Sequence, residues 1–450
     1  MKMPSMAGCV KKIPFASWID FIPLLVILFC LVCPADAEDS TAMFTLESSI
    51  RRALEKSTAI QSALQGVVAS KEREDGQFTE FLPTFSSGYS YTRQDSERSV
   101  GSLVLSPQDI YEFSATVNQP IFRGFDLITK YRVAGLELDI SRFELEQTRQ
   151  DIILRAKEAY FGVLRAERLL RVAEDAVTRL TAHAEVARNF YDVGMTPKND
   201  LLEAEVELAN AKQELVVAEN RLQEVSAEFN TLLRRPIDAP VVLEDILTYE
   251  PITQDYESCW ETAKQSRREL RVADLQVEIG ERNVQIVRKD YMPEVNFQGS
   301  YNKLGDDPDV RGGEGIIDPD SWNVMLSATW TFWEWGKTRH GVKEQLCFLA
   351  QAKEQRKQVE DDIRLEVKRA YLRLRDSGKA IFTVKKAIEQ AQENLRMNEE
   401  RYKEQVVTST EVLDARTLLS ETETNYYNAL SAYNIAKAKL YRAMGVEIIR

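Results

Sequence analysis

The stretch Pro83-Thr-Phe-Ser-Ser-Gly-Tyr-Ser-Tyr-Thr92 alternates between apolar and polar side chains. Its aromatic residues stand at positions 85, 89 and 91 and share one face of an extended chain, while serine and threonine occupy the other face. A polar loop is expected from about 94 to 109, and residues 112–118 then alternate in the same way. The pattern predicts a hairpin of two strands with one apolar and one polar face.

The same pattern returns 210 residues later, where Pro293 corresponds to Pro83. The second apolar face holds Val295, Phe297 and Tyr301 and, after a loop from Leu304 to Asp320, Trp322, Val324, Leu326, Ala328 and Trp330. Strands of about ten residues with an aromatic-rich face and a polar face are typical of barrels that span a bilayer. The alternative is a pair of amphipathic hairpins on a soluble sheet, and the remaining features of the chain favour the barrel.

Long helical patterns follow each hairpin, and the last helix of each set carries heptads. In the first set, Leu201, Leu208, Leu215, Leu222 and Phe229 are spaced by seven, with Ala204, Ala211, Ala218, Val225 and Leu232 three positions further on. In the second set, the corresponding residues are Val412, Leu419, Tyr426, Tyr433 and Leu440, with Ala415, Thr422, Ala429, Ala436 and Ala443. Unbroken heptads of this kind predict coiled-coil packing.

Helix, hairpin, long helix and shorter helix therefore occur twice, which indicates two copies of one supersecondary unit. The predicted organisation is a signal peptide (1–37), a first repeat (38–234) with a hairpin at 83–122 and helices at 127–191 and 199–233, a linker (235–255), a second repeat (256–445) with a hairpin at 293–333 and helices at 337–402 and 409–444, and a C-terminal tail (446–450). A single helical run is expected before each hairpin, over 44–80 and 256–290.

The N-terminal residues have the features of an export signal. Lys2, Lys11 and Lys12 precede an apolar run at 21–33, and Ala35-Asp-Ala37 matches a small-x-small cleavage site. The apolar run is too short for a retained membrane anchor. The residues before Cys33 do not form a lipidation box, so we expect no lipid anchor.

Composition and residue types exclude several classes of function. A net charge of -13 without a basic cluster argues against nucleic-acid binding. Only His183 and His340 are present, and no nucleophile or phosphate-binding motif occurs, so we expect no enzyme activity, no cofactor and no metal site. Outside the signal, Cys259 and Cys347 are expected as small core residues, with a disulfide as the alternative. The acidic loop 306–320 is expected to be a solvated loop, with Ca²⁺ binding as the alternative.

The strand count limits the architecture. Four spanning strands per chain are too few for a membrane barrel, and open strand edges are not tolerated in lipid. Three chains would supply twelve strands, and the helices would continue from them. The predicted fold is therefore mainly α with a membrane β-barrel, in which the duplicated unit forms a trimeric 12-strand β-barrel continued by a coiled-coil α-barrel.

Several short motifs accompany this arrangement. They are Phe81-Leu-Pro83 and Tyr291-Met-Pro293 before the strands, Pro120-Ile-Phe-Arg-Gly124 and Trp330-Thr-Phe-Trp-Glu-Trp-Gly336 after the return strands, and Tyr191-Asp-Val-Gly-Met-Thr-Pro-Lys-Asn-Asp-Leu-Leu202 at a helix break. With the duplication, they resemble the TolC family of outer-membrane efflux and secretion channels over residues 44–445. The resemblance implies a homotrimer in outer-membrane lipid with a periplasmic helical barrel. It also implies a periplasmic adaptor (membrane fusion) protein and an inner-membrane pump of the RND or ABC type as partners.

The function implied by this resemblance is a passive trans-periplasmic exit duct in a tripartite efflux pump or a type I secretion system. The alternative is an exported periplasmic or surface coiled-coil structural protein, which would explain the signal and the heptads but not the hairpins. The family also implies a docking tip at Val193, Gly194 and Met195, where methionine replaces the usual leucine. Glycine permits a left-handed turn there, and Thr196-Pro197 suits an N-cap and a first helical position. The alternative is a turn with no partner.

Tyr402, Glu411 and Asp414 match the family's periplasmic constriction, where acidic side chains ring the pore. The alternative for Glu411 is a capping box with Thr408 at a helix start. The second break lacks the glycine, which weakens the prediction of docking there. Val407 stands where the family carries a basic residue that helps to hold the closed gate.

Overall fold

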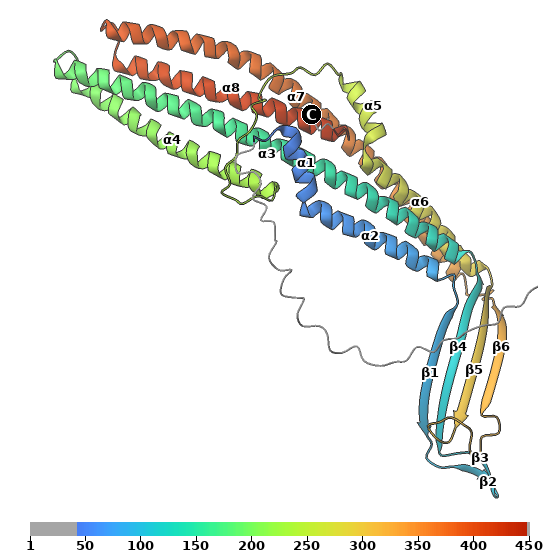
Figure 1. The fold of residues 1–450 in the computed structure, drawn as a ribbon. Coiled ribbons are helices and arrows are strands. Elements are labelled where there is room, and N and C mark those ends of the chain that lie inside the picture. The colour runs from blue at the N-terminus through green and yellow to red at the C-terminus, as the bar shows by residue number, and fades with distance from the viewer. Residues whose placement is uncertain (1–42, 448–450) are drawn as a thin grey trace, which may run out of the picture. The chain divides into compact units, whose positions relative to one another are not determined.

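The computed structural model describes residues 43–447, so the predicted signal peptide and the end of the predicted tail lie outside the described residues. The first half contains α1 (Leu46–Lys56), α2 (Thr58–Thr79), β1 (Thr84–Arg93), β2 (Arg98–Val100), β3 (Leu103–Ser106), β4 (Asp109–Arg123), α3 (Asp126–Asp192) and α4 (Lys198–Leu232). The second half contains α5 (Tyr256–Ser266), α6 (Arg268–Arg288), the 3-10 helix η1 (Lys289–Tyr291), β5 (Glu294–Gly305), β6 (Asp320–Thr329), α7 (Lys337–Lys403) and α8 (Ser409–Ala443) (Figure 1).

Helices dominate this part of the chain, as the sequence predicted. The two long helices α3 and α7 have 67 residues each, which corresponds to about 100 Å of helix. α3 packs along α4, α7 packs along α8, and α8 also contacts α3. In α8 most of the heptad positions are buried, namely Val412, Ala415, Leu419, Thr422, Tyr433, Ala436, Leu440 and Ala443. No described helix is both long and apolar enough to cross a membrane.

The helical run before each hairpin is broken, which corrects the expectation of one continuous helix over 44–80 and another over 256–290. Ser57 separates α1 from α2, and Arg267 separates α5 from α6. Both residues have extended backbone, with ψ of 122° and 121°. The Ser57 hydroxyl accepts the backbone N–H of Ile60, so this residue ends one helix and caps the next.

The strands form one antiparallel sheet in the order β1-β4-β5-β6. The register sorts the side chains by polarity, because partners in an antiparallel ladder lie on the same face. Phe85 pairs with Val117, Tyr89 with Phe113, Tyr301 with Trp322, and Phe297 with Leu326. The other face is formed mainly by the intervening polar residues, for example Ser86, Thr116, Ser300 and Asn323. One apolar and one polar face therefore extend across all four strands.

The polar loop expected at 94–109 contains a small hairpin instead. β2 and β3 pair there, with Ser99 opposite Val104 and Val100 opposite Leu103. Val100, Leu103 and Leu105 make this segment more apolar and more strand-forming than a solvated loop.

The sheet is open in the single chain. β1 and β6 are its edges, and each is ten residues long. The twelve-strand barrel expected from the sequence would thus need strands from other chains.

Residues 235–255, here called the strap, run across one side of the helices (Figure 1). The Tyr160 hydroxyl of α3 donates to the Glu244 carbonyl of the strap at 2.7 Å, and the Phe44 carbonyl lies 3.1 Å from the same hydroxyl. On α8, the Tyr433 hydroxyl donates to the carbonyl of Glu250 at 2.7 Å. The strap therefore fixes the side of α3 and α8 that it covers.

Candidate functional site

The first helix–helix turn, between α3 and α4, contains the predicted docking residues. The Gly194 N–H donates to Tyr191 O at 2.9 Å, and the Met195 N–H donates to Phe190 O at 2.8 Å. This is the hydrogen-bond pattern of a Schellman motif, which needs a left-handed residue after the helix, and Gly194 has φ 75°. Val193 is 68 % exposed and Met195 is 55 % exposed. The turn therefore presents two apolar side chains that no described residue covers.

The start of α4 differs by one position from the prediction. Pro197 occupies the N-cap and Lys198 begins the helix, whereas Thr196 was expected as the cap. Proline has no side-chain acceptor for the free N–H groups, so this helix start lacks a side-chain cap.

The second turn, between α7 and α8, has the same geometry without a glycine. The Gln405 N–H donates to Tyr402 O at 3.0 Å, and the Val406 N–H donates to Arg401 O at 2.9 Å. Gln405 is left-handed, with φ 58°. Val406 is exposed like Val193. The second turn therefore forms without a glycine. Each of the two turns carries one exposed valine.

The three predicted gate residues do not lie together. Tyr402 is 4 % exposed and packs between the rings of His183 and Phe190, with ring centroids 5.1 and 5.7 Å away. Glu411 and Asp414 are exposed on the first turns of α8. Three residues apart on a helix, these two carboxylates lie on neighbouring positions of one face.

The capping-box alternative for Glu411 is wrong. Thr408 is the N-cap of α8, but its side chain makes no capping hydrogen bond. The neighbouring Ser409 is buried, and its hydroxyl lies 2.9 Å from Nε2 of His183 on α3. The start of α8 is therefore joined to α3 by a side chain that the sequence did not single out.

His183 is held as a neutral imidazole in this contact. Burial, helped by the positive charge of Arg416, lowers the pKa of His183 to about 4. Nothing in the local sequence marks this residue, because its partners Tyr402 and Ser409 are distant in the chain. Its rarity, as one of two histidines, was the only available signal.

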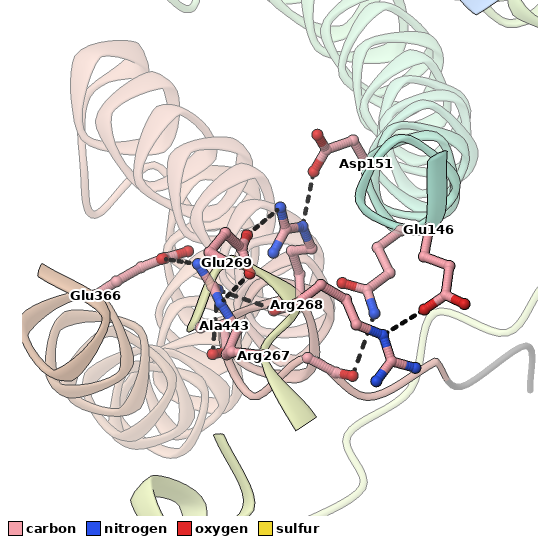
Figure 2. Close-up of polar contacts among 10 residues, drawn as sticks. Glu146, Asp151, Arg267, Arg268, Glu269, Glu366 and Ala443 are labelled. Carbon is pink, nitrogen blue, oxygen red and sulfur yellow. Dashed lines mark hydrogen bonds and ion pairs between the residues drawn. The ribbon is translucent and has the colours of Figure 1, made fainter. Parts of the chain in front are cut away.

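A second polar cluster lies at the junction of α5 and α6 (Figure 2). The Arg267 side chain is 5 % exposed, and its guanidinium donates to the carbonyls of Arg442 and Ala443 at the end of α8, at 3.3 and 3.2 Å. It also forms ion pairs with Glu366 of α7 at 2.7 Å and with Glu269 of α6 at 2.9 Å. A cation at the carboxyl end of a helix satisfies free carbonyls and offsets the helix dipole.

Neighbouring side chains extend this cluster to α3. Arg442 pairs with Asp151 at 2.7 Å, and Arg268 pairs with Glu146 at 2.5 Å. Figure 2 shows these contacts reaching across from α3 to the α5–α6 junction. The cluster thus connects α3, α6, α7 and α8 at one level. The sequence signal for this cluster lies in the repeat. Arg267 stands 210 residues after Ser57, at the equivalent position of the second repeat, so arginine replaces a helix-capping serine there.

The remaining candidates carry no site. Cys259 is buried, as expected of a core residue, but Cys347 is exposed, so that expectation was wrong for Cys347. Both are free thiols and are not joined to each other. In the acidic loop, Asp306 accepts the N–H of Glu314 and Asp307 accepts the N–H of Asp309, so these carboxylates shape the loop itself. Within residues 43–447, no group of three or more His, Cys, Asp or Glu side chains is placed to hold a metal ion.

A two-faced sheet joined to long paired helices is typical of membrane channels with a helical extension, and comparison with known proteins identifies the family. A family model described as outer membrane efflux protein matches residues 49–233 and 260–446. The chain is 22 % identical to the outer membrane protein TolC of Vibrio cholerae over 303 residues, which cover 66 % of this chain and 68 % of the relative. It is 20 % identical to the outer membrane efflux protein BepC of Brucella suis over 405 residues, covering 89 % and 85 %.

The fold also matches solved structures. The crystal structure of the CmeC outer membrane channel of Campylobacter jejuni superposes with a TM-score of 0.77 at 14 % identity, covering 89 % of this chain and 85 % of that one. The chain belongs to the outer membrane efflux protein family. The resemblance drawn from the sequence is confirmed, and the protein is an efflux channel protein of the outer membrane.

Proposed function

We propose that this protein is the outer-membrane channel of a tripartite efflux pump or a type I secretion system, and that it acts as a passive exit duct as a homotrimer. The sheet register carries this proposal. Four strands place their apolar side chains on one face, which suits lipid, and mainly polar side chains on the other, which suits a water-filled lumen. The alternative, a soluble coiled-coil rod, does not explain a sheet with one apolar and one polar face.

Closure of the barrel follows from the two free edges. β1 and β6 have equal lengths, so β6 of one chain can pair with β1 of the next along ten residues. Unpaired N–H and C=O groups cost several kcal/mol each in lipid, which makes closure obligatory. Three chains of four strands give the twelve-strand barrel, and the paired helices continue it as a periplasmic duct.

The exposed turns are the proposed contact with a periplasmic adaptor, and through it with an RND or ABC pump. Val193 and Met195 are uncovered apolar side chains at the end of the α3–α4 pair. Val193→Asp combined with Met195→Asp should abolish export in cells while purified protein still forms pores. Export at the normal rate would mean that the turn has no partner.

The proposed constriction is formed by Glu411 and Asp414. The buried Tyr402 packs against His183 and so supports the start of α8. Three chains would bring six carboxylates near the axis, where they favour cations. Glu411→Gln combined with Asp414→Asn removes the charges without changing side-chain size and should reduce the cation preference in planar-bilayer recordings. Thr408→Ala is the matched control, because Thr408 makes no capping hydrogen bond.

These recordings also test the function as a whole. Stepwise conductance from the purified wild-type protein is the expected result. A protein that never conducts would overturn the proposed function. Conductance with unchanged selectivity in the double variant would place the constriction elsewhere along the duct.

A further inference from the structure

A groove of about 940 Å³ lies between α3, α7 and α8, close to the Arg267 cluster. Its floor is apolar and includes Leu154 from α3, Ala370 from α7, and Ile435 with Ala436 from α8. Its rim is basic and includes Arg165, Arg369, Arg373 and Lys439. An apolar floor beneath several cations is the arrangement that binds a solute with an apolar body and an anionic group.

The three rim arginines have no partner among the described side chains. Within residues 43–447, Arg165, Arg369 and Arg373 form no hydrogen bond or ion pair of their own, whereas the neighbouring Arg442 pairs with Asp151. Lys439, in contrast, pairs with Glu158 at 2.9 Å.

The acids lining the groove do not neutralise these arginines. Glu366 is paired with Arg267, and Asp362 accepts a hydrogen bond from Gln358 at 3.0 Å. Guanidinium groups without a carboxylate partner are available to bind an anion in two-pronged geometry.

The groove opens on the side of α8 that the strap does not cover. Tyr433 contacts the strap, and Ile435 and Lys439 follow it by two and six residues. At about 100° per residue these positions lie roughly 200° and 240° around the helix from Tyr433. In a tube of three chains the strap would obstruct the duct if it faced inward. In such a tube the strap would face outward, and the groove, on the opposite side of α8, would face the lumen.

We propose that this groove is a binding site inside the duct for anionic amphipathic solutes, with Arg165, Arg369 and Arg373 holding the anionic group and the apolar floor holding the body. The assignment rests on the proposed channel function, because it requires a lumen. Three copies would form a basic belt in a duct whose proposed constriction is acidic. Anionic cargo that passes the constriction would bind at this belt on its way out.

Naphthalene-1-sulfonate is a suitable probe, because it combines an apolar ring system with one sulfonate and partitions little into lipid. We expect it to block single-channel current of the wild-type protein and to bind the amphipol-solubilised protein in isothermal titration calorimetry. Arg369→Gln combined with Arg373→Gln should raise both the half-blocking concentration and the dissociation constant by about tenfold or more. The cation naphthyltrimethylammonium should bind the wild-type protein more weakly than the sulfonate does.

Arg375→Gln is the matched control, since Arg375 is exposed on the same helix but does not line the groove. It should leave binding and block unchanged. Absence of binding to the wild-type protein overturns the site, as does an equal loss in the Arg375 variant, which would indicate only a general effect of net charge. Calorimetry does not depend on conductance, so a protein that binds the sulfonate without conducting contradicts the channel function and not the groove.

Discussion

The two helix turns share one hydrogen-bond pattern, but the left-handed residue is Gly194 in the first turn and Gln405 in the second. Gly194 adopts this conformation without a steric penalty, and Gln405 adopts it at a cost. Gln405→Gly should therefore raise the free energy of unfolding by about 1 kcal/mol, and Gly194→Val should lower it by about 1–2 kcal/mol. Chemical denaturation of the purified variants measures both. A loss of stability in the Gln405 variant would contradict this view of the turn.

His183, which contacts the start of α8, makes the free energy of unfolding sensitive to acid. Its native pKa of about 4 lies below its ordinary value of 6.5, so the unfolded chain takes up a proton before the native protein does. This contribution to the free energy of unfolding is present above pH 6.5 and decreases as the pH falls towards 4, by about 3 kcal/mol in total.

Unfolding midpoints measured between pH 7 and pH 4 test this pH dependence. His183→Gln should remove this part of the pH dependence, whereas His340→Gln, at an exposed position, should retain it. Identical pH profiles for the wild-type protein and the His183 variant would refute the proposed role of burial.

At the level of elements, strand β6 separates its two faces residue by residue. Leu326 is exposed on the apolar face, and Ser327 belongs to the polar face, where it donates to Asn296 O. Leu326→Arg should hinder membrane assembly by about 2–4 kcal/mol near the midplane, and Ser327→Arg should be tolerated in the lumen. The yield of heat-modifiable protein in membrane fractions compares the two. Equal yields would mean that lipid and lumen have been assigned to the wrong faces.

The Arg267 cluster joins helices from both halves of the chain. Arg267→Met removes the cation from the end of α8 and leaves Glu366 without its partner. Because Glu366 is half exposed, the main loss is the hydrogen bond to the buried Ala443 carbonyl, and stability should fall by about 1–3 kcal/mol. Arg375→Gln serves as the exposed control, and thermal unfolding is the measurement. A variant as stable as the wild type would show that apolar packing alone holds this level of the helices.

For the whole molecule, the free edges of the sheet determine the assembly. Light scattering of detergent-extracted protein should give the mass of three chains, because four strands cannot satisfy their own edges in lipid. A stable monomer in membranes would contradict the barrel and, with it, the lumen in which the groove was placed.

Periodicity in the chain was enough to predict the helical character and the two-faced hairpins, whereas the family was predicted from a resemblance in its short motifs and its duplication. The helical character and the hairpins depend on which side chains share a face, and a period of two or of seven reports that directly. The breaks at Ser57 and Arg267 were missed, because the apolar pattern continues through them while the backbone does not.

Contacts between distant residues were decided by packing alone. The contact of His183 with Ser409 and that of Arg267 with Ala443 join positions 226 and 176 residues apart. The basic groove likewise draws its arginines from α3 and α7, which belong to different repeats. Local pattern shows that such residues are polar and helical, but only the lateral packing of four helices brings them to the same level.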